Sequence, residues 1–303
     1  MKLPNKRNWA ARLRKAAGFT LIELLVSVGI MASLLVLLIQ LVGNIVQSWG
    51  HANSILIQNS ESALCMDYIA KDMGSAMFRD DGAVWFIGVQ EPIEKSGSMP
   101  EMTTAFVRFF STATDRGSSL AEAASTQNLG NLTAIGYRIY KINTFNPDSD
   151  SGKIYGLYRF VVNPRLTFDE FQGKLQSKDA DAFMAAEGDK KVTVAKSFLA
   201  SNLVKFDMKL GYKVKTDLNG NGLADDVKEL TISSTPVSFP LFDGEEKILR
   251  PDYVDVTFYI ISEAGRKRLD ALAAGQVEET LEQILLQETR AFGRRILIES
   301  QGI

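Results

Sequence analysis

The sequence has one cysteine and one histidine in 303 residues, and these two scarcities exclude several kinds of site. A single cysteine, Cys65, can form no intramolecular disulfide and no cysteine zinc site, so the globular part must be stabilised by burial of apolar side chains. A single histidine, His51, leaves a serine or cysteine nucleophile only one candidate base. The chain also lacks a phosphate-binding Gly-x-x-x-x-Gly-Lys loop. We therefore expect no enzyme, and a membrane-anchored hydrolase is the least favoured alternative.

Charged side chains are absent from residues 24–60, a run of 37 residues whose first part, residues 24–46, is mostly Leu, Val and Ile. About 20 apolar residues suffice to cross the hydrocarbon core of a bilayer. The run therefore predicts a membrane-spanning helix. Proline is absent between Pro4 and Pro92, so no residue of this type ends the helix where the span ends.

We expect one helix from Phe19 to about Phe78, ended by the turn residues Asp80-Asp81-Gly82. Its outer half is amphipathic and predicts packing against a globular head. The predicted packing stripe consists of Leu56, Ala63, Met66, Ala70, Met73 and Met77, at spacings of 7, 3, 4, 3 and 4 residues.

Glu23 lies near the start of this helix, where an ionisable side chain costs a few kcal/mol in a membrane unless it is paired or close to the interface. One interpretation is that its carboxylate reaches the headgroups at the cytoplasmic end. The other is that it neutralises a cation supplied by a neighbouring subunit. A cut after Gly18 would give Phe19 a free amine about one helical turn from Glu23, and the two charges could satisfy each other.

Positive charge is concentrated in the leader, residues 1–18, which carries six bases and no acid. The remainder has 28 bases against 36 acids. By the positive-inside rule the leader stays in the cytoplasm and the head crosses the membrane. The acidic remainder argues against nucleic-acid binding, since phosphate contacts need Lys and Arg.

The apolar run follows the proposed cut, whereas a secretory signal carries its apolar run before the cut. The mature protein would therefore keep its anchor; an uncleaved signal anchor is the alternative. These features divide the chain into a leader at residues 1–18, a transmembrane segment at 19–46, an amphipathic helix at 47–80 and a head at 81–303.

Residues 15–26, Lys-Ala-Ala-Gly-Phe-Thr-Leu-Ile-Glu-Leu-Leu-Val, resemble the class III signal and helix start of type IV pilins and type II secretion pseudopilins. The resemblance implies cleavage by a prepilin peptidase between Gly18 and Phe19, N-methylation of Phe19, and a role in filament assembly for Glu23, the fifth mature residue. It implies other pilin-like subunits as partners and, indirectly, an assembly ATPase and a platform membrane protein. It also implies a single-pass protein of the bacterial inner membrane with a periplasmic head.

Later stretches extend the resemblance. Residues 198–206 and the strand after them look like the corresponding segment of J-type minor pseudopilins and W-type minor pilins, and residues 256–261 and 292–298 are similar to their closing strands. The chain also resembles pilin-like proteins of the verrucomicrobial cassette class. The expected function is that of a minor pseudopilin or pilin-like structural subunit. The alternative is a binding subunit at a filament tip that contacts DNA, a surface or a secreted substrate.

The head reads as strands and late helices, which indicates an α+β fold with mainly antiparallel sheet. We expect strands at residues 84–90, 105–112, 133–143, 153–163, 203–214, 227–233, 253–262 and 290–299. In residues 203–214 a period of two places Leu203 with the polar positions and Val204 with the buried ones. Helical stretches are expected at 166–187 and 262–287, and a surface loop at 111–131.

One loop has the residue types of a calcium site. Its oxygen-bearing side chains are Asp217, Asn219, Asn221 and Asp225, with Gly222 for the turn. Position twelve of an EF-hand would be Lys228 in place of the bidentate glutamate, so the loop is closer to the short turns of thrombospondin type 3 repeats. The alternative is a turn with no metal, because Asn-Gly and Asp residues favour turns for backbone reasons alone.

Overall fold

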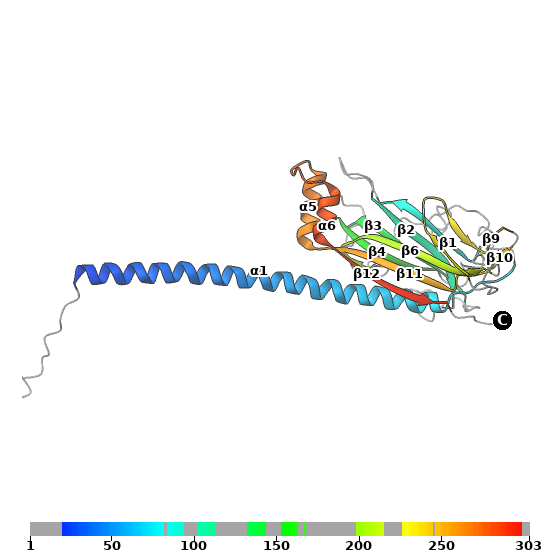
Figure 1. The fold of residues 1–303 in the computed structure, drawn as a ribbon, viewed down its shortest axis with the longest axis horizontal. Coiled ribbons are helices and arrows are strands. Elements are labelled where there is room, and N and C mark those ends of the chain that lie inside the picture. The colour runs from blue at the N-terminus through cyan, green and yellow to red at the C-terminus, as the bar shows by residue number, and fades with distance from the viewer. Residues whose placement is uncertain are drawn as a thin grey trace, which may run out of the picture. The chain divides into compact units, whose positions relative to one another are not determined.

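The structure, a computed structural model, describes residues 20–81, 84–93, 102–112, 132–143, 153–162, 167, 198–214, 226–244 and 246–298. Its first element is one continuous helix, α1 (Leu21–Gly74), which begins in the compact unit Met1–Asn53 and ends in the compact unit Ser54–Ile303 (Figure 1). The sequence predicted this long helix, which contains no proline. The predicted end near Phe78 is wrong by about a turn, because residues after Gly74 pair with a strand: Ala76 bridges Ser111 and the Met77 N–H donates to the Phe110 carbonyl at 2.8 Å.

The first unit consists, in its described part, of α1 residues whose apolar side chains are exposed along the whole segment. Two serines of this segment, Ser27 and Ser33, do not require an outside partner. Ser27 Oγ donates to the Leu24 carbonyl at 2.9 Å and Ser33 Oγ to the Ile30 carbonyl at 2.8 Å. Their hydroxyls are thus satisfied within the helix, as a membrane environment requires.

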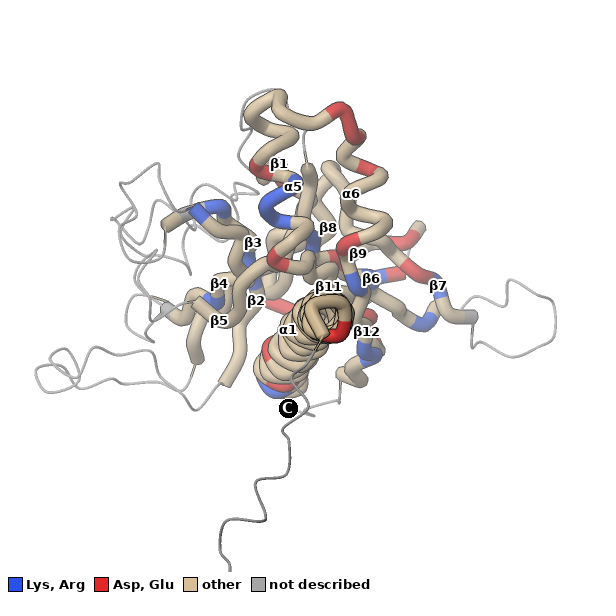
Figure 2. Tube along the Cα trace, turned by 90° about the vertical axis from the view of Figure 1, so that its left-hand side faces the viewer, with Lys and Arg blue, Asp and Glu red and all other residues tan. Residues whose placement is uncertain are grey.

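The second unit contains the outer part of α1 and the head. The head has antiparallel sheets of six, four and two strands. The six-stranded sheet has the order β5-β4-β3-β2-β1-β8 and the four-stranded sheet the order β12-β11-β6-β7, while β10 pairs with β9. The strand bounds are β1 Phe86–Pro92, β2 Thr103–Ser111, β3 Thr133–Ile142, β4 Ile154–Val162, β5 Phe198–Ser201, β6 Leu203–Val214, β7 Asp226–Thr231, β8 Val237–Phe239, β9 Leu241–Asp243, β10 Glu246–Ile248, β11 Tyr253–Ile261 and β12 Thr289–Leu297. Figure 2 shows Lys and Arg interspersed with Asp and Glu over these strands.

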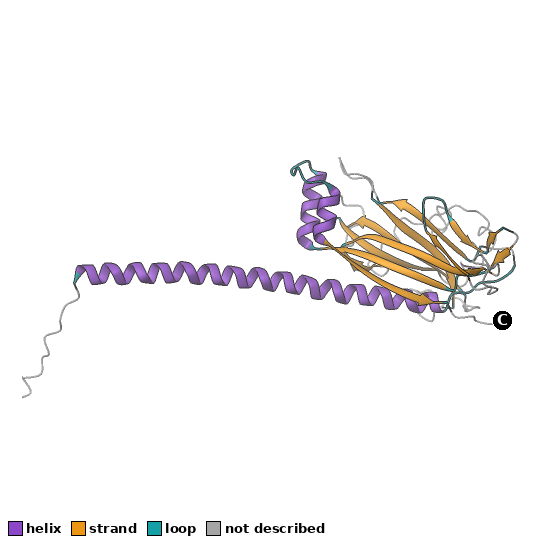
Figure 3. Ribbon diagram, viewed as in Figure 1, coloured by secondary structure: helices purple, strands orange, loops and turns teal. Residues whose placement is uncertain are grey.

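Two helices connect β11 to β12. They are α5 (Glu263–Ala273) and α6 (Leu281–Glu288), which lie side by side at one end of the strands, opposite β9 and β10 (Figure 3). The predicted helical stretch is interrupted, because Gly275 takes a positive φ of 69° and ends the first helix. Each helix has its own N-cap: the Ser262 hydroxyl accepts from the Gly265 N–H, and Thr280 forms a capping box with Gln283.

The α+β prediction with mainly antiparallel sheet is confirmed. The long strands lie within about two residues of their predicted bounds, because each alternates or is rich in β-branched and aromatic residues. One face assignment is wrong. Leu203 is fully buried, although alternation placed it with the polar positions; it pairs with Ile260 beside a register shift in the β6–β11 ladder. The short strands β5, β8, β9 and β10 were not predicted, and the predicted helix at 166–187 lies outside the described residues apart from Thr167.

The main core lies between the outer part of α1 and the two larger sheets. From α1 it includes Cys65, Ile69 and Met73, and from the four-stranded sheet Phe206 and Phe258, all fully buried. Two hydrogen bonds join the sheets directly: Thr104 Oγ1 on β2 accepts from the Phe206 N–H at 3.0 Å and donates to the Phe206 carbonyl at 3.3 Å. A second aromatic cluster covers the other face of the six-stranded sheet; it contains Trp85, Phe106, Phe110, Ala134, Tyr158 and Phe160.

The predicted packing stripe on α1 is correct for Met66 and Met73 and wrong for Leu56 and Ala63, which are exposed. The buried face is displaced around the helix from the predicted one. It consists of Gln58, Ser62, Cys65, Met66, Ile69, Asp72, Met73 and Ala76. Polar residues belong to this face, so a stripe chosen by apolar character alone could not find it.

A charged cluster buried in the head joins α1 to the six-stranded sheet. Asp72 on α1 is fully buried, and Arg159 on β4 donates to both of its carboxylate oxygens, at 2.7 and 2.8 Å. The Tyr137 hydroxyl on β3 donates to the same carboxylate. Burial and then the negative charge of Asp72 raise the pKa of Tyr137 well above its usual range, so the phenol keeps its proton. The Arg159 guanidinium also lies over the ring of Tyr68, 5.4 Å from its centroid.

Glu61, one turn before Cys65 on α1, is bonded to the end of β5. The Glu61 carboxylate accepts from the Ser201 N–H at 3.1 Å and from the Ser201 hydroxyl at 3.0 and 3.1 Å. Burial, which outweighs these hydrogen bonds, raises the pKa of Glu61. Burial and the Glu61 charge together raise the pKa of the Cys65 thiol to about 12. Cys65 is therefore a packed, protonated core residue.

We predict that Asp72→Asn lowers the free energy of unfolding by about 3–5 kcal/mol, because it leaves the Arg159 charge buried without a counter-ion. Urea denaturation of the detergent-solubilised full-length chain, followed by tryptophan fluorescence, measures this change. Asp67→Asn is the control: Asp67 pairs with Arg294 at 2.9 Å, both side chains are at least half exposed, and the loss should stay under about 1 kcal/mol. Equal losses in the two variants would contradict a structural role for the buried pair.

We also predict that Cys65 resists alkylation by iodoacetamide at pH 8 in the folded protein and reacts fully in denaturant. The reason is that the thiolate is the reactive species and that both burial and the raised pKa suppress it. Mass spectrometry of the alkylated chain measures the extent of reaction. Complete labelling under native conditions would show that the thiol is accessible.

Candidate functional site

The amino end of α1 contains the one acid of the apolar segment, Glu23. Thr20 precedes the helix as its N-cap: its carbonyl accepts from the Glu23 and Leu24 N–H groups at 3.1 and 3.2 Å, and its hydroxyl accepts from the Glu23 N–H at 3.3 Å. Thr-x-x-Glu is the sequence pattern of a capping box, in which the glutamate occupies the third helical position. The cap and the positive end of the helix dipole together favour a carboxylate at this place.

Glu23 shares one face of α1 with apolar neighbours. A shallow surface depression is lined by Thr20, Ile22, Glu23, Val26, Ser27 and Ile30. No described side chain covers this face, and Glu23 forms no ion pair with any of the described residues. The geometry leaves the carboxylate available to a cation from another molecule.

The exposed apolar surface around Glu23 is large. Of the large hydrophobic side chains between Leu21 and Val46, none is less than 48% exposed. At roughly 25 cal/mol per Å² of apolar surface, keeping such a helix in water is strongly unfavourable. By length and composition α1 qualifies as a membrane span, and a bilayer of about 30 Å hydrocarbon thickness would cover the segment.

Several predicted site residues lie outside the described residues. Gly18 and Phe19, at the predicted cleavage point, precede the first described residue. The predicted calcium ligands Asp217, Asn219, Asn221 and Asp225 belong to the connection between β6 and β7, which is likewise outside. Among the residues that are described, no group of three or more histidine, cysteine, aspartate or glutamate side chains could hold a metal ion.

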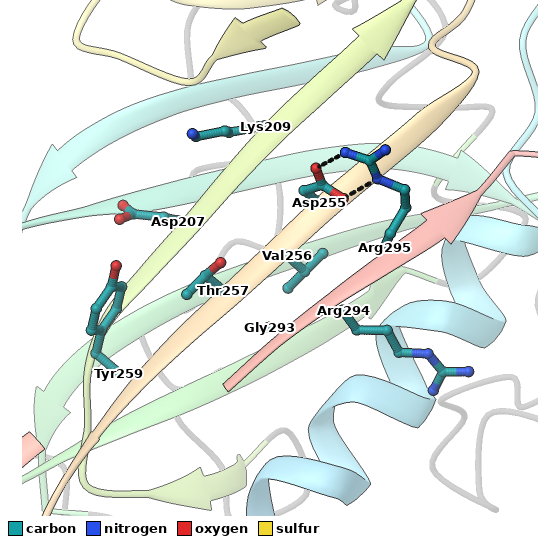
Figure 4. Close-up of a pocket in the computed structure, with 9 residues that line it drawn as sticks. All are labelled: Asp207, Lys209, Asp255, Val256, Thr257, Tyr259, Gly293, Arg294 and Arg295. Atoms are coloured by element: carbon teal, nitrogen blue, oxygen red, sulfur yellow. Dashed lines mark hydrogen bonds and ion pairs between the residues drawn. The ribbon is translucent and has the colours of Figure 1, made fainter. Parts of the chain in front are cut away.

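The face of the four-stranded sheet that points away from the core carries a polar hollow of about 410 Å³ (Figure 4). We call it the sheet hollow. It is lined by Asp207 and Lys209 on β6, by Asp255, Val256, Thr257 and Tyr259 on β11, and by Gly293, Arg294 and Arg295 on β12. Strand pairing brings these residues together: Asp207 lies opposite Thr257, which lies opposite Gly293.

Ion pairs and aromatic rings border the sheet hollow on two sides. Arg295 donates to both Asp255 oxygens, at 2.7 and 2.6 Å, and stacks 3.8 Å from the centroid of the Tyr253 ring. The Arg295 hydrogen bonds lower the pKa of Asp255. On the other side Lys205 pairs with Asp207 at 2.8 Å and lies over the Tyr259 ring. These contacts hold the side chains in place around the hollow.

Sequence reasoning missed both the buried Asp72–Arg159 pair and the sheet hollow. For Asp72 a weak sign exists, because Asp72 lies between the apolar residues Ile69 and Met73 in the outer part of the helix. The hollow gives no local sign, since its residues come from three strands that only pairing makes neighbours. The Thr20–Glu23 capping pattern, by contrast, is readable in the sequence.

Comparison with known proteins gives one match. The family described as the prokaryotic N-terminal methylation motif matches residues 13–39, which include Gly18, Phe19 and Glu23 and the first part of α1. Neither the curated proteins nor the solved structures contain a match to the chain. The matched motif and the single apolar helix that follows it support, for this amino end, a type IV pilin-like protein with a prepilin-type methylation motif and a helix suited to membrane anchoring.

Proposed function

We propose that the chain is a minor pseudopilin or pilin-like structural subunit, cut by a prepilin peptidase between Gly18 and Phe19, methylated at Phe19, and assembled into a type II secretion or type IV pilus-like filament. One observation carries the proposal: the methylation motif covers the start of an apolar helical segment whose one acid, Glu23, is exposed and has no ion-pair partner among the described residues. J-type minor pseudopilins, W-type minor pilins and the cassette class are the subtypes that the head resembles.

The pairing partner of Glu23 would be the amine that cleavage creates. Phe19 and Glu23 are four residues apart in the sequence, a separation of about one turn if both were helical. In a bundle of parallel helices, a small axial stagger brings the amine of one subunit beside the carboxylate of the next. Each charge alone in the membrane costs a few kcal/mol, whereas the pair replaces two unsatisfied groups by one contact. The pairing would therefore favour an assembly of several subunits over a single inserted helix whose charges are unpaired.

The charge distribution supports the proposed orientation. All six leader bases precede Phe19, and the charge-free run follows Glu23 directly. The leader would stay on the cytoplasmic side, where the prepilin peptidase would act, and the head would lie in the periplasm. Partners would be other pilin-like subunits, with an assembly ATPase and a platform membrane protein acting indirectly.

We predict that the mature protein begins at Phe19 and carries one extra methyl group on its amine. Mass spectrometry of the amino-terminal peptide of the purified protein tests both points. A Gly18→Leu variant, which replaces the small residue before the cut, should keep the leader and so supply the mass of the uncut form. Intact leader on the wild-type protein in its functional state would refute the processing step.

We further predict that Glu23→Gln inserts into the membrane and is processed normally but is incorporated with pilin-like partners at least tenfold less. The substitution keeps the shape and removes the charge; tenfold corresponds to about 1.4 kcal/mol, below the few kcal/mol expected for an unpaired charge. Incorporation is measured by co-purification of the partners from crosslinked membranes. Ser27→Ala is the control, because the Ser27 hydroxyl bonds within its own helix. Wild-type incorporation of Glu23→Gln would exclude the pairing role.

A further inference from the structure

The two outer strands of the four-stranded sheet, β12 and β7, each have one edge without a partner strand among the described residues (Figure 2). At nine residues, β12 is the longest edge strand of the described sheets, and its pairing with β11 continues over its whole length without a register shift. Neither edge strand contains proline, and most side chains of β12 are exposed. Because an edge strand presents unpaired N–H and C=O groups, these two edges can each accept a further strand.

The edges of the six-stranded sheet are protected, whereas the edge of β12 is not. β5 and β8 have only four and three residues, and Glu61 on α1 accepts from a backbone N–H of β5. Charged side chains on an edge also oppose pairing, but two of the three arginines of β12 are turned toward their own chain. Arg295 donates to Asp255 on the sheet face, and Arg294 pairs with Asp67 on α1.

The two open edges carry opposite net charge. β12 contains three arginines and no acid, whereas β7 contains Asp226 and Glu229 with one base, Lys228. Like charges on adjacent strands are destabilising and opposite charges are stabilising. Two β12 edges would therefore repel each other. The strand that fits the β12 edge carries an excess of acid, and β7 of a second copy of this chain meets that requirement.

Strand pairing determines which edge side chains share the outer face, the face that carries the sheet hollow. On the outer face β12 presents Gly293, Arg295 and Leu297, and β7 presents Val227, Glu229 and Thr231. Since residues opposite each other in a sheet lie on the same face, a register with Val227 opposite Leu297 also places Glu229 opposite Arg295. Leu297 and Val227 are 68% and 47% exposed. This register therefore covers two apolar side chains and aligns two opposite charges.

The strand directions also favour contact between unlike edges. Directions alternate along the order β12-β11-β6-β7, so β12 and β7 are antiparallel to each other. Two copies anchored by α1 in one membrane have their strands in the same sense. A contact between two β12 edges would then be parallel, whereas β12 of one copy and β7 of the next would be antiparallel, as are all three ladders of this sheet.

We propose that β12 of one copy pairs with β7 of a second copy, with Leu297 opposite Val227, so that the four-stranded sheets of adjacent heads form one continuous sheet. Main-chain hydrogen bonds would supply affinity, and the side chains opposite each other would set the register. The contact is heterologous, so each copy keeps one free edge for the next copy. It uses the head alone and does not rest on the proposed function, because neither processing nor Glu23 takes part in it.

A pair of cysteines in one chain tests the contact. The full-length Val227→Cys/Leu297→Cys variant is expressed without pilin-like partners, and its membranes are treated with a bifunctional thiol reagent of about 5 Å, the Cβ separation of opposite residues. Within one chain the two positions are three strand spacings apart, about 14 Å, so each crosslink joins two chains. We expect dimers, trimers and larger products on a non-reducing denaturing gel. The native Cys65 is fully buried and serves as the background in the wild-type chain.

The matched control is Leu286→Cys/Leu297→Cys, because Leu286 is 86% exposed but lies on α6, away from both edges. We expect products larger than dimers to be at least about tenfold less abundant in this control, the ratio that about 1.4 kcal/mol of contact free energy gives. Equal ladders in the two double variants, or no product larger than a dimer from Val227→Cys/Leu297→Cys, would overturn the proposal.

Two further measurements separate this contact from other occupants of the edge. Leu297→Cys alone should give little dimer; a dimer yield equal to that of the double variant would show that two β12 edges pair, and a crosslink to a different protein would show another occupant, so either result overturns the proposal. Adding Glu23→Gln to the double cysteine variant should leave the ladder unchanged. Loss of the ladder in that variant would assign the crosslinks to association of the spans and would contradict a contact made by the heads.

Discussion

The buried pair of Asp72 and Arg159 is the constraint on which the arrangement of the head depends. Two ions inside an apolar core are expensive to desolvate, and the cost is offset only if their geometry is good and their remaining hydrogen bonds are made. Arg159 and Tyr137 meet both conditions at the Asp72 carboxylate. Rotating α1 by one residue, about 100°, would take the carboxylate away from Arg159 and leave both charges unpaired. The pair therefore fixes which face of α1 belongs to the core.

This constraint explains why hydrophobic periodicity misplaced the packing face of α1. The outer part of the helix has apolar residues on more than one side, so the pattern alone does not say which side packs on the head. Leu56 and Leu64 are exposed, at 66% and 48%, while Gln58, Ser62 and Asp72 are buried. Asp72 on the buried face is bonded to Arg159 and Tyr137 of the six-stranded sheet, and the Ser62 hydroxyl donates to the Asn59 carbonyl of its own helix. No described residue covers Leu56 or Leu64 to the same degree. An apolar face left open beside a satisfied core is the property expected of a helix that packs twice, once in its own head and once against other molecules.

The sequence predicted most of the strands for a physical reason that also marks where such prediction stops. Long strands such as β6 and β11 alternate in burial along their length, and alternation is visible in one dimension. Strands of three residues, such as β8 and β9, have too few positions to show a period. The same limit hides the sheet hollow, because Asp207, Thr257 and Gly293 become neighbours only through the order β12-β11-β6. The amino end was predictable because its signals, the basic leader, Glu23 and the charge-free run after it, follow one another directly along the chain.

The chain thus has two kinds of open surface with different physical uses. Any apolar surrounding stabilises the apolar side chains of α1, so they favour association without selecting a partner. The one charge of the span, at Glu23, adds a geometric requirement, because a cation that stabilises this carboxylate must lie at a fixed height along the helix. The sheet hollow works in the opposite way. Two of its carboxylates, Asp207 and Asp255, are paired with Lys205 and Arg295, so this surface presents directional hydrogen-bonding groups in place of apolar area. No residue of the hollow belongs to α1 and no residue of the span lines the hollow, so a substitution in one of these surfaces leaves the side chains of the other in place.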